Sequence, residues 1–129
     1  ADEYRAMRIC NNGLYKKFLK DVPGIVFQKD TANGVNVHWM NAILVDTKKI
    51  SATRDGLIAH LKVHGIETRL LFAGMHLQPG LLKVGCDGAG DYSVTDRLTA
   101  DGLYLPSASN LSEDDIRYVC DRIREVARG

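Results

Sequence analysis

The chain has 129 residues and an almost balanced charge, with 17 Lys and Arg against 16 Asp and Glu. Hydrophobic residues make up 45% of it and charged residues 26%, which is typical of a single globular domain. The balance argues against a nucleic-acid-binding or anionic-membrane-binding protein, because both need a basic surplus on one face. No apolar run approaches the roughly 18 residues that would span a bilayer, and the first residues do not resemble a signal peptide.

The cysteines Cys10, Cys86 and Cys120 are far apart, and none belongs to a C-x-x-C pair. An odd and scattered set excludes a complete disulfide framework and removes the thioredoxin and zinc-ribbon classes. Cys10 and Cys120 fall in helical patterns, where a free cysteine usually behaves as a small buried hydrophobe. We therefore expect these two to be buried and the protein to be cytoplasmic, in a reducing compartment.

The first half of the chain predicts one helix followed by strands. Residues 1–20 place Asn11 within a helical apolar stripe, and Pro23 ends the helix. The stripe consists of Tyr4, Met7, Leu14, Tyr15 and Phe18. A short strand is expected at residues 25–27. Residues 35–46 alternate in the strongest strand pattern of the chain, and both of their faces become apolar toward the end, which favours a central strand.

The second half alternates between helices and strands. Thr53 is expected to cap a helix that runs to His64 and ends at Gly65. Residues 66–72 alternate as a strand, residues 73–90 are glycine-rich and irregular, and residues 91–100 predict a short helix. A brief strand follows at residues 103–105.

The last helix has the clearest signals. Ser112 and Asp115 resemble a capping box, and the apolar stripe consists of Ile116, Val119, Cys120, Ile123 and Val126. Few strands separated by helices favour an α+β fold, in which helices pack on a small sheet. No linker or repeat divides the chain, so we expect residues 1–129 to form one domain.

Three common site motifs are incomplete. The loop Gly88-Ala-Gly90 would need a third glycine at position 93 to bind a dinucleotide, and Ser93 stands there, so an ordinary turn is the better interpretation. His60 and His64 have the i, i+4 spacing of a metal-binding helix, but no third ligand lies nearby in sequence, and we expect no metal site. No G-x-S-x-G elbow supports a hydrolase triad.

Three residues remain as candidates for a binding site. Arg69 lies mid-strand beside the glycine-rich stretch, where its guanidinium could bind a carboxylate or phosphate or could pair with Glu67. His76 follows that strand, next to Gln78, and is either a hydrogen-bonding group for a ligand or an exposed loop residue. His38 lies on the mixed face of the 35–46 strand and stays ambiguous, whereas its neighbours Trp39 and Met40 are expected in the core.

Several segments, taken in order, resemble the C-terminal domain of the DegT/DnrJ/EryC1/StrS aminotransferases. They are Asn11-x-x-x-Tyr15-x-x-x-Leu19, Val37-His-Trp-Met-Asn-Ala-Ile43, Arg54-Asp-Gly-Leu-Ile-Ala-His-Leu61, Gly65-Ile-Glu-Thr-Arg69, Met75-His-Leu-Gln-Pro79, Gly102-Leu-Tyr-Leu-Pro-Ser107 and Leu111-Ser-Glu-Asp-Asp-Ile116. Each segment alone is weakly specific, but the ordered set covers nearly the whole chain.

The resemblance implies a small antiparallel sheet flanked by helices, as in the C-terminal domain of a fold type I enzyme. It also implies a homodimer that uses pyridoxal 5′-phosphate and moves an amino group from glutamate to a nucleotide-linked keto sugar. A smaller branch of the family uses pyridoxamine phosphate to dehydrate such sugars, and Leu70-Leu-Phe-Ala-Gly74 resembles that branch. The segments at residues 75–79 and 102–107 resemble perosamine-synthase-type aminotransferases, which favours transamination.

The sequence departs from the family in one respect that decides where the chemistry occurs. The segment with the Schiff-base lysine, the aspartate on the pyridine nitrogen and the phosphate cradle are not found in it. We therefore expect residues 1–129 to be the small C-terminal domain, without catalytic, cofactor-binding or metal-binding residues of its own. Arg69, His76 and His38 would lie on the substrate side of the intact enzyme. The alternative is a stand-alone, non-catalytic binding or interaction domain.

Overall fold

The computed structural model describes residues 2–128, which form an α+β fold around an antiparallel sheet. The strands are β1 (Ile25–Phe27), β2 (Asn41–Val45), β3 (Arg69–Leu70) and β4 (Gly102–Leu105), in the spatial order β1-β2-β4-β3. The helices are α1 (Asp2–Leu19), α2 (Arg54–Val63), α3 (Pro79–Lys83), α4 (Ser93–Asp101) and α5 (Glu113–Arg128), with a 3₁₀ turn η1 (Met75–Leu77). The predicted fold class is confirmed, and β2 is a central strand, between β1 and β4.

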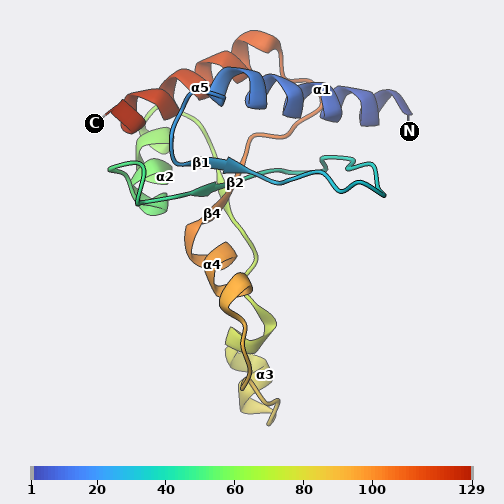
Figure 1. The fold of residues 1–129 in the computed structure, drawn as a ribbon, viewed down its shortest axis with the longest axis vertical. Coiled ribbons are helices and arrows are strands. Elements are labelled where there is room, and N and C mark those ends of the chain that lie inside the picture. Colours follow the sequence, from blue (N-terminus) through green and yellow to red (C-terminus); the bar gives the residue numbers. More distant parts are fainter. Residues whose placement is uncertain (1, 129) are drawn as a thin grey trace.

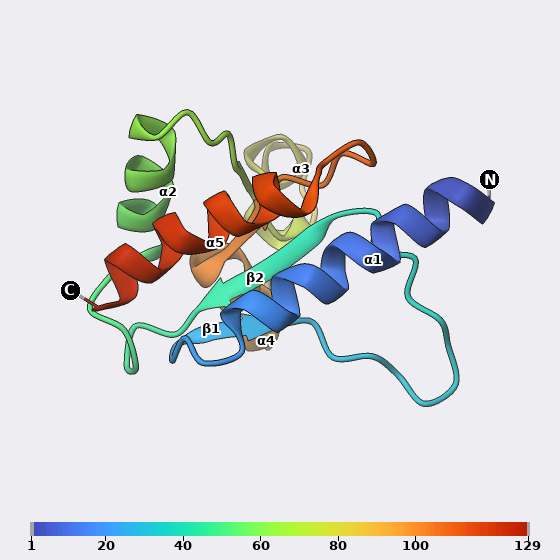
Figure 2. The ribbon, with the colours of Figure 1, turned by 90° about the horizontal axis from the view of Figure 1, so that it is seen from above.

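Helices α1 and α5 lie side by side on one face of the sheet, and α2 packs beside α5 (Figures 1 and 2). Side chains of β2 alternate, with Ile43 and Val45 buried toward this helical layer. The apolar stripe of α5 meets them, and Ile116 and Ile123 are fully buried. Burial of this stripe stabilises the fold because each fully buried aliphatic side chain contributes about 1.5–3 kcal/mol.

Helices α2 and α5 begin where their capping residues predict. Thr53 Oγ1 accepts from Gly56 N at 3.1 Å, and Gly65, just after α2, has φ +73 in the left-handed region. At α5, Asp115 N donates to Ser112 Oγ at 3.1 Å, and Ser112 N donates to Asp115 Oδ2 at 2.9 Å. Ser112 Oγ also donates to Asp115 Oδ2 at 2.7 Å, and this bond, together with the one from Ser112 N, lowers the pKa of the Asp115 carboxyl. The predicted capping box is confirmed.

A buried polar network ties α1 to β2 and to the segment after β4. Asn12 Nδ2 donates to Asn41 Oδ1 at 3.0 Å, and Asn41 N donates to Ser107 Oγ at 2.8 Å. Asn11 and Tyr15 each donate to a backbone carbonyl of residues 106–108 at 3.0 Å. Burial raises the pKa of the Tyr15 hydroxyl, so that it remains a donor at any ordinary pH. Each member of the network therefore has a partner, as a buried polar group requires.

Some sequence predictions are wrong about extent and burial. The 35–46 strand contracts to residues 41–45, because His38 takes φ +46 in the left-handed region and Val35 and Val37 are exposed. The 66–72 strand contracts to β3, which pairs only with β4.

The first half of α1 extends past the sheet (Figure 2), and its predicted stripe is not fully buried. Tyr4 and Met7 are 64% and 37% exposed. Cys10 is exposed as well, contrary to expectation, whereas Cys120 is buried and its pKa is raised to about 12 by that burial.

Residues 71–101 leave the sheet and extend away from it as a narrow projection, the arm, formed by η1, α3 and α4 (Figure 1). The prediction of irregular structure over residues 73–90 is wrong for residues 75–77 and 79–83, which form η1 and α3, and is confirmed for the rest of that stretch. The rest of the described chain, residues 2–70 and 102–128, is called the body below. None of the helices in residues 2–128 has the length and apolarity needed to cross a membrane.

Candidate functional site

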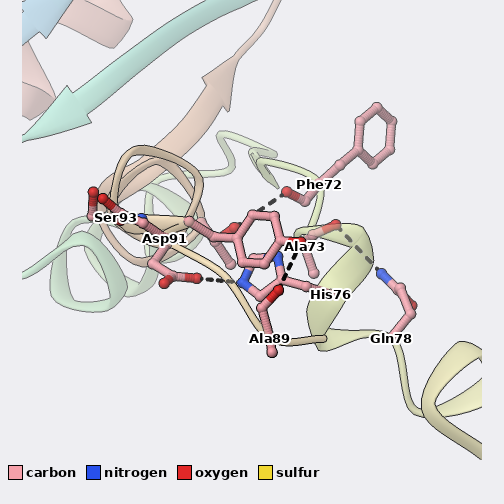
Figure 3. Close-up of polar contacts among 10 residues, drawn as sticks. Phe72, Ala73, His76, Gln78, Ala89, Asp91 and Ser93 are labelled. Carbon is pink, nitrogen blue, oxygen red and sulfur yellow. Dashed lines mark hydrogen bonds and ion pairs between the residues drawn. The ribbon is translucent and has the colours of Figure 1, made fainter. Parts of the chain in front are cut away.

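His76 lies in η1 on the arm and is held from two sides (Figure 3). Its Nε2 is 2.8 Å from Asp96 Oδ1 on α4, and its ring stacks on Tyr92 with centroids 4.0 Å apart and an interplanar angle of 12°. An ionised carboxylate only accepts hydrogen bonds, so Nε2 carries a proton. In the neutral ring, Nδ1 is then an acceptor, and no donor within residues 2–128 bonds to it. The alternative of an exposed loop residue is wrong, because the side chain is only 10% exposed.

A glycine makes room for this imidazole. A Cβ on Gly74 would stand 2.5 Å from His76 Cε1 and 2.7 Å from Nδ1. Gln78, which sequence reasoning placed beside His76, instead donates to Ala73 O at 3.4 Å (Figure 3). Residues 72–76, 81–82, 86–88, 92 and 95 together line an open pocket of about 650 Å³ around His76.

Arg69 begins β3 and its side chain is exposed. Its guanidinium makes no ion pair within residues 2–128, so the alternative of a salt bridge to Glu67 is wrong. It lines a second pocket of about 630 Å³, together with Arg8. Arg8 donates to the carbonyls of Trp39 and Ser107, the second at 3.2 Å. Of the two arginines that line this pocket, Arg69 is the one whose guanidinium N–H groups are all available to bind a ligand.

The open face of the sheet connects these two pockets. It carries an apolar hollow of about 510 Å³ that shares Trp39 and Tyr104 with the Arg69 pocket and Phe72 and Thr95 with the His76 pocket. Trp39 is 62% exposed, and Met40 is half buried and lines two of the hollows, so their expected place in the core is wrong. Arg69 and His76 thus lie toward opposite ends of one continuous, largely apolar surface.

His38 lies apart from the other two candidates. Its imidazole is buried, with Nε2 3.8 Å from Asp30 Oδ1, and it lines none of the three hollows above. Burial lowers its pKa, and the nearby Lys16 ammonium lowers it further, against a smaller opposing effect of Asp30. The structure therefore brings Arg69 and His76 to one surface and leaves His38 in the body.

Sequence reasoning missed three residues of this surface. Asp96 on α4 and Tyr92, the residue just before α4, meet His76 across the arm, and Arg8 comes from the exposed half of α1. An acidic and an aromatic residue four apart on a predicted helix next to a loop histidine were the available signal for the first two. Nothing near Arg8 in the sequence indicates its pocket.

His60 and His64 also gain a neighbour that the sequence does not place beside them. His60 Nε2 lies 3.2 Å from Glu125 Oε2 on α5, so the fold supplies a third potential ligand that we did not expect.

The model of the DegT/DnrJ/EryC1/StrS aminotransferase family matches residues 1–124. The chain belongs to this family. The GDP-perosamine synthase of Caulobacter vibrioides is 32% identical over 126 residues, which cover 97% of this chain and 33% of that protein. The spore coat polysaccharide biosynthesis protein SpsC of Bacillus subtilis is 25% identical, over 91% of this chain and 30% of that protein.

A crystal structure of DesI with its TDP-sugar product superimposes with a TM-score of 0.82 at 30% identity, covering 95% of this chain and 31% of DesI. The chain thus spans about a third of the length of the relatives it matches. The segments that carried the resemblance divide into two groups in the structure. Asn11, Tyr15, Asn41 and Ser107 form the buried network, whereas the 65–69 and 75–79 segments carry Arg69 and His76 to the open surface.

Proposed function

We propose that this chain is the small C-terminal domain of a pyridoxal-phosphate-dependent aminotransferase. The intact protein would transfer an amino group from glutamate to a nucleotide-linked keto sugar, in surface-polysaccharide or related amino-sugar biosynthesis, as a cytoplasmic homodimer. Family membership over residues 1–124 supports the reaction class. Two relatives, a GDP-perosamine synthase and a polysaccharide biosynthesis protein, favour this activity over sugar dehydration.

The single observation that carries a substrate-binding role is the free guanidinium of Arg69 at the edge of the open surface. A nucleotide-linked sugar is anionic through its diphosphate, and arginine binds phosphate or carboxylate through two parallel hydrogen bonds. With no partner in the described chain, Arg69 has no bond to break before it binds such a group. We assign it the role of orienting an anionic group of the substrate.

His76 is suited to a hydrogen bond at a fixed position. The Asp96 carboxylate sets its tautomer and the stacked Tyr92 sets its ring plane, so Nδ1 is the nitrogen left for a ligand. A group fixed by neighbouring residues loses little entropy on binding. We assign His76 a positioning hydrogen bond to the substrate.

The residues of this chain do not fit the cofactor itself. When bound, pyridoxal phosphate would accept electron density from the carbon that bears the amino group being transferred, and it would need a lysine and an acidic partner for its ring. Within residues 2–128 no lysine lines the Arg69 or His76 pocket, and the half-buried Lys16 is paired with Asp30 at 3.1 Å. We derive no chemical step from this chain and propose that a separate large domain holds the cofactor.

Kinetics of the intact enzyme test the assignment of Arg69. We expect Arg69→Ala to raise the KM for the nucleotide sugar by about tenfold or more, since a charge-assisted hydrogen bond contributes about 1.5–3 kcal/mol. Arg97→Ala, the same change at an exposed arginine of α4 that lines none of the three hollows, is the matched control and should leave KM unchanged. If Arg69→Ala alters neither KM nor turnover, this role is wrong.

Two further measurements test His76 and the cofactor assignment. Gly74→Ala should displace the His76 ring and lower kcat/KM, whereas Gly80→Ala, with nothing within 4 Å of the new methyl, should not.

The purified 129-residue chain mixed with pyridoxal phosphate should show no stable Schiff-base absorbance. A band that one lysine substitution abolishes would contradict the proposal that the cofactor is held elsewhere.

A further inference from the structure

Three potential metal ligands meet where the end of α2 packs beside the last turns of α5. One nitrogen from each of His60 and His64 and a carboxylate oxygen of Glu125 all lie within 4.8 Å of one another. The two rings are tilted by 44° with centroids 4.4 Å apart, and His60 Nε2 is 3.2 Å from Glu125 Oε2. This cluster is separate from the residues that line the Arg69 and His76 pockets.

Two of the three ligands, His64 and Glu125, are oriented by a second contact. His64 Nδ1 lies 2.9 Å from the His60 carbonyl, which can only accept, so Nδ1 carries the proton and Nε2 has the free lone pair. Arg122 Nη1 binds the other carboxylate oxygen of Glu125, Oε1, at 2.8 Å and leaves Oε2 toward His60. Metal-binding imidazoles and carboxylates are typically held by such outer contacts, which fix the ring tautomer and the direction of the lone pair.

The distances are close to those of a tetrahedral site. Two N/O ligands at about 2.0–2.1 Å from a zinc ion stand about 3.3 Å apart when the angle at the metal is tetrahedral. The 3.2 Å between His60 Nε2 and Glu125 Oε2 is close to this spacing, and the ligand nitrogen of His64 lies within 4.8 Å of both. His60 and Glu125 are 27% and 44% exposed, so an ion can enter from solvent.

The electrostatics of the helix also favour a cation there. His60 is in the last turn of α2 and His64 is its C-cap, where the partial negative charge of the helix end attracts positive charge. Glu125 adds a formal negative charge, so a divalent ion would be bound by two neutral imidazoles and one carboxylate. This donor set is the one that zinc takes in several of its three-ligand sites.

We propose that His60, His64 and Glu125 form a Zn²⁺-binding site that joins α2 to α5 and leaves one coordination position open to solvent. The proposal is independent of the transaminase assignment, because none of its ligands lines the substrate surface. The bound ion would stabilise the body, since a ligand that binds only the folded state raises the free energy of unfolding.

Zinc titration of the purified protein, without a histidine tag, tests the site. We expect one Zn²⁺ per chain by calorimetry and a rise in the midpoint of thermal unfolding. His64→Gln and Glu125→Gln should each weaken binding by about tenfold or more, in line with the loss that even outer-contact changes produce. Glu113→Gln, on the same helix, is the matched control and should bind as the parent does.

Cobalt absorption distinguishes metal binding by these residues from a purely structural role, because it reports direct coordination of the ion. Co²⁺ in a tetrahedral N/O site should show visible absorption bands that Zn²⁺ displaces and that the Glu125→Gln protein lacks. Circular dichroism of each variant shows whether it folds. Absence of saturable zinc uptake, or uptake equal in the folded His64→Gln and Glu125→Gln proteins, would overturn the proposal.

Discussion

The body and the arm differ in how they are held together. The core residues and the partly buried apolar side chains packed on them all come from the body. In the arm, Phe72, Met75 and Val84 are each at least 70% exposed, although Leu71 and Leu81 are half buried. The body is therefore stabilised by burial, whereas the arm depends on a few polar contacts such as His76 with Asp96 and Thr99 Oγ1 with Phe72 O at 3.4 Å.

This difference separates stability from candidate function. Arg54 is the first residue of α2, and its Nη1 donates to Thr99 O at 3.0 Å and to Gly102 O at 3.3 Å. These bonds attach the base of the arm to the body. Beyond that base, the arm displays His76 and a series of exposed apolar side chains. Contiguous exposed apolar surface marks a place where another part of a protein or a ligand packs.

Identical leucine truncations in the two regions should have very different effects. Leu103 on β4 is fully buried, so Leu103→Ala should lower the free energy of unfolding by about 2–5 kcal/mol through lost burial and the cavity left behind. Leu82 on α3 is 47% exposed, and Leu82→Ala should cost less than about 1 kcal/mol. Urea unfolding followed by circular dichroism measures both. Equal losses would mean that the arm has a packed core of its own.

The joint between the regions can be tested with glycine substitutions. A Cβ on Gly102 would collide with the Leu71 side chain and with the backbone oxygen of Leu98, where the arm leaves the sheet. Gly102→Ala should therefore lower the free energy of unfolding by about 1–3 kcal/mol. Gly80→Ala, on α3 with nothing within 4 Å, should be neutral or slightly stabilising. A neutral Gly102→Ala would show that the arm moves away from β4 at little cost.

Local sequence signals predicted the body better than the arm. Thr53, Gly65 and the Ser112–Asp115 pair located the helix ends because a cap depends on residues only a few positions apart. Strand length could not be predicted in the same way. Residues 35–40 alternate like a strand, but the turn in the backbone at His38 and the lack of a pairing strand exclude them from the sheet.

The candidate site was predicted only in part, for the same physical reason. Arg69 and His76 are visible as unusual residues beside a long glycine-rich stretch, but Asp96 lies 20 residues from His76 in sequence. Glu125 lies 65 residues from His60, and only the packing of α2 beside α5 brings them together. Partners so distant in sequence follow from the tertiary fold, which no local pattern contains.

The smallest expected effect concerns His38, a buried histidine of the body, rather than His76 of the arm. Burial lowers the pKa of His38 in the native chain, whereas in the unfolded chain this pKa has its ordinary value of 6.5. Just below pH 6.5, the imidazole therefore takes up a proton in the unfolded chain but stays neutral in the native one. Stability should therefore be full above pH 6.5 and fall as the pH decreases through the lowered pKa. In His38→Asn, whose side chain tolerates the left-handed backbone, this part of the pH dependence should vanish. The free energy of unfolding, measured above and below pH 6.5 for both proteins, checks this prediction. If the free energy changes with pH as steeply in the variant as in the parent, the pH dependence belongs to other groups.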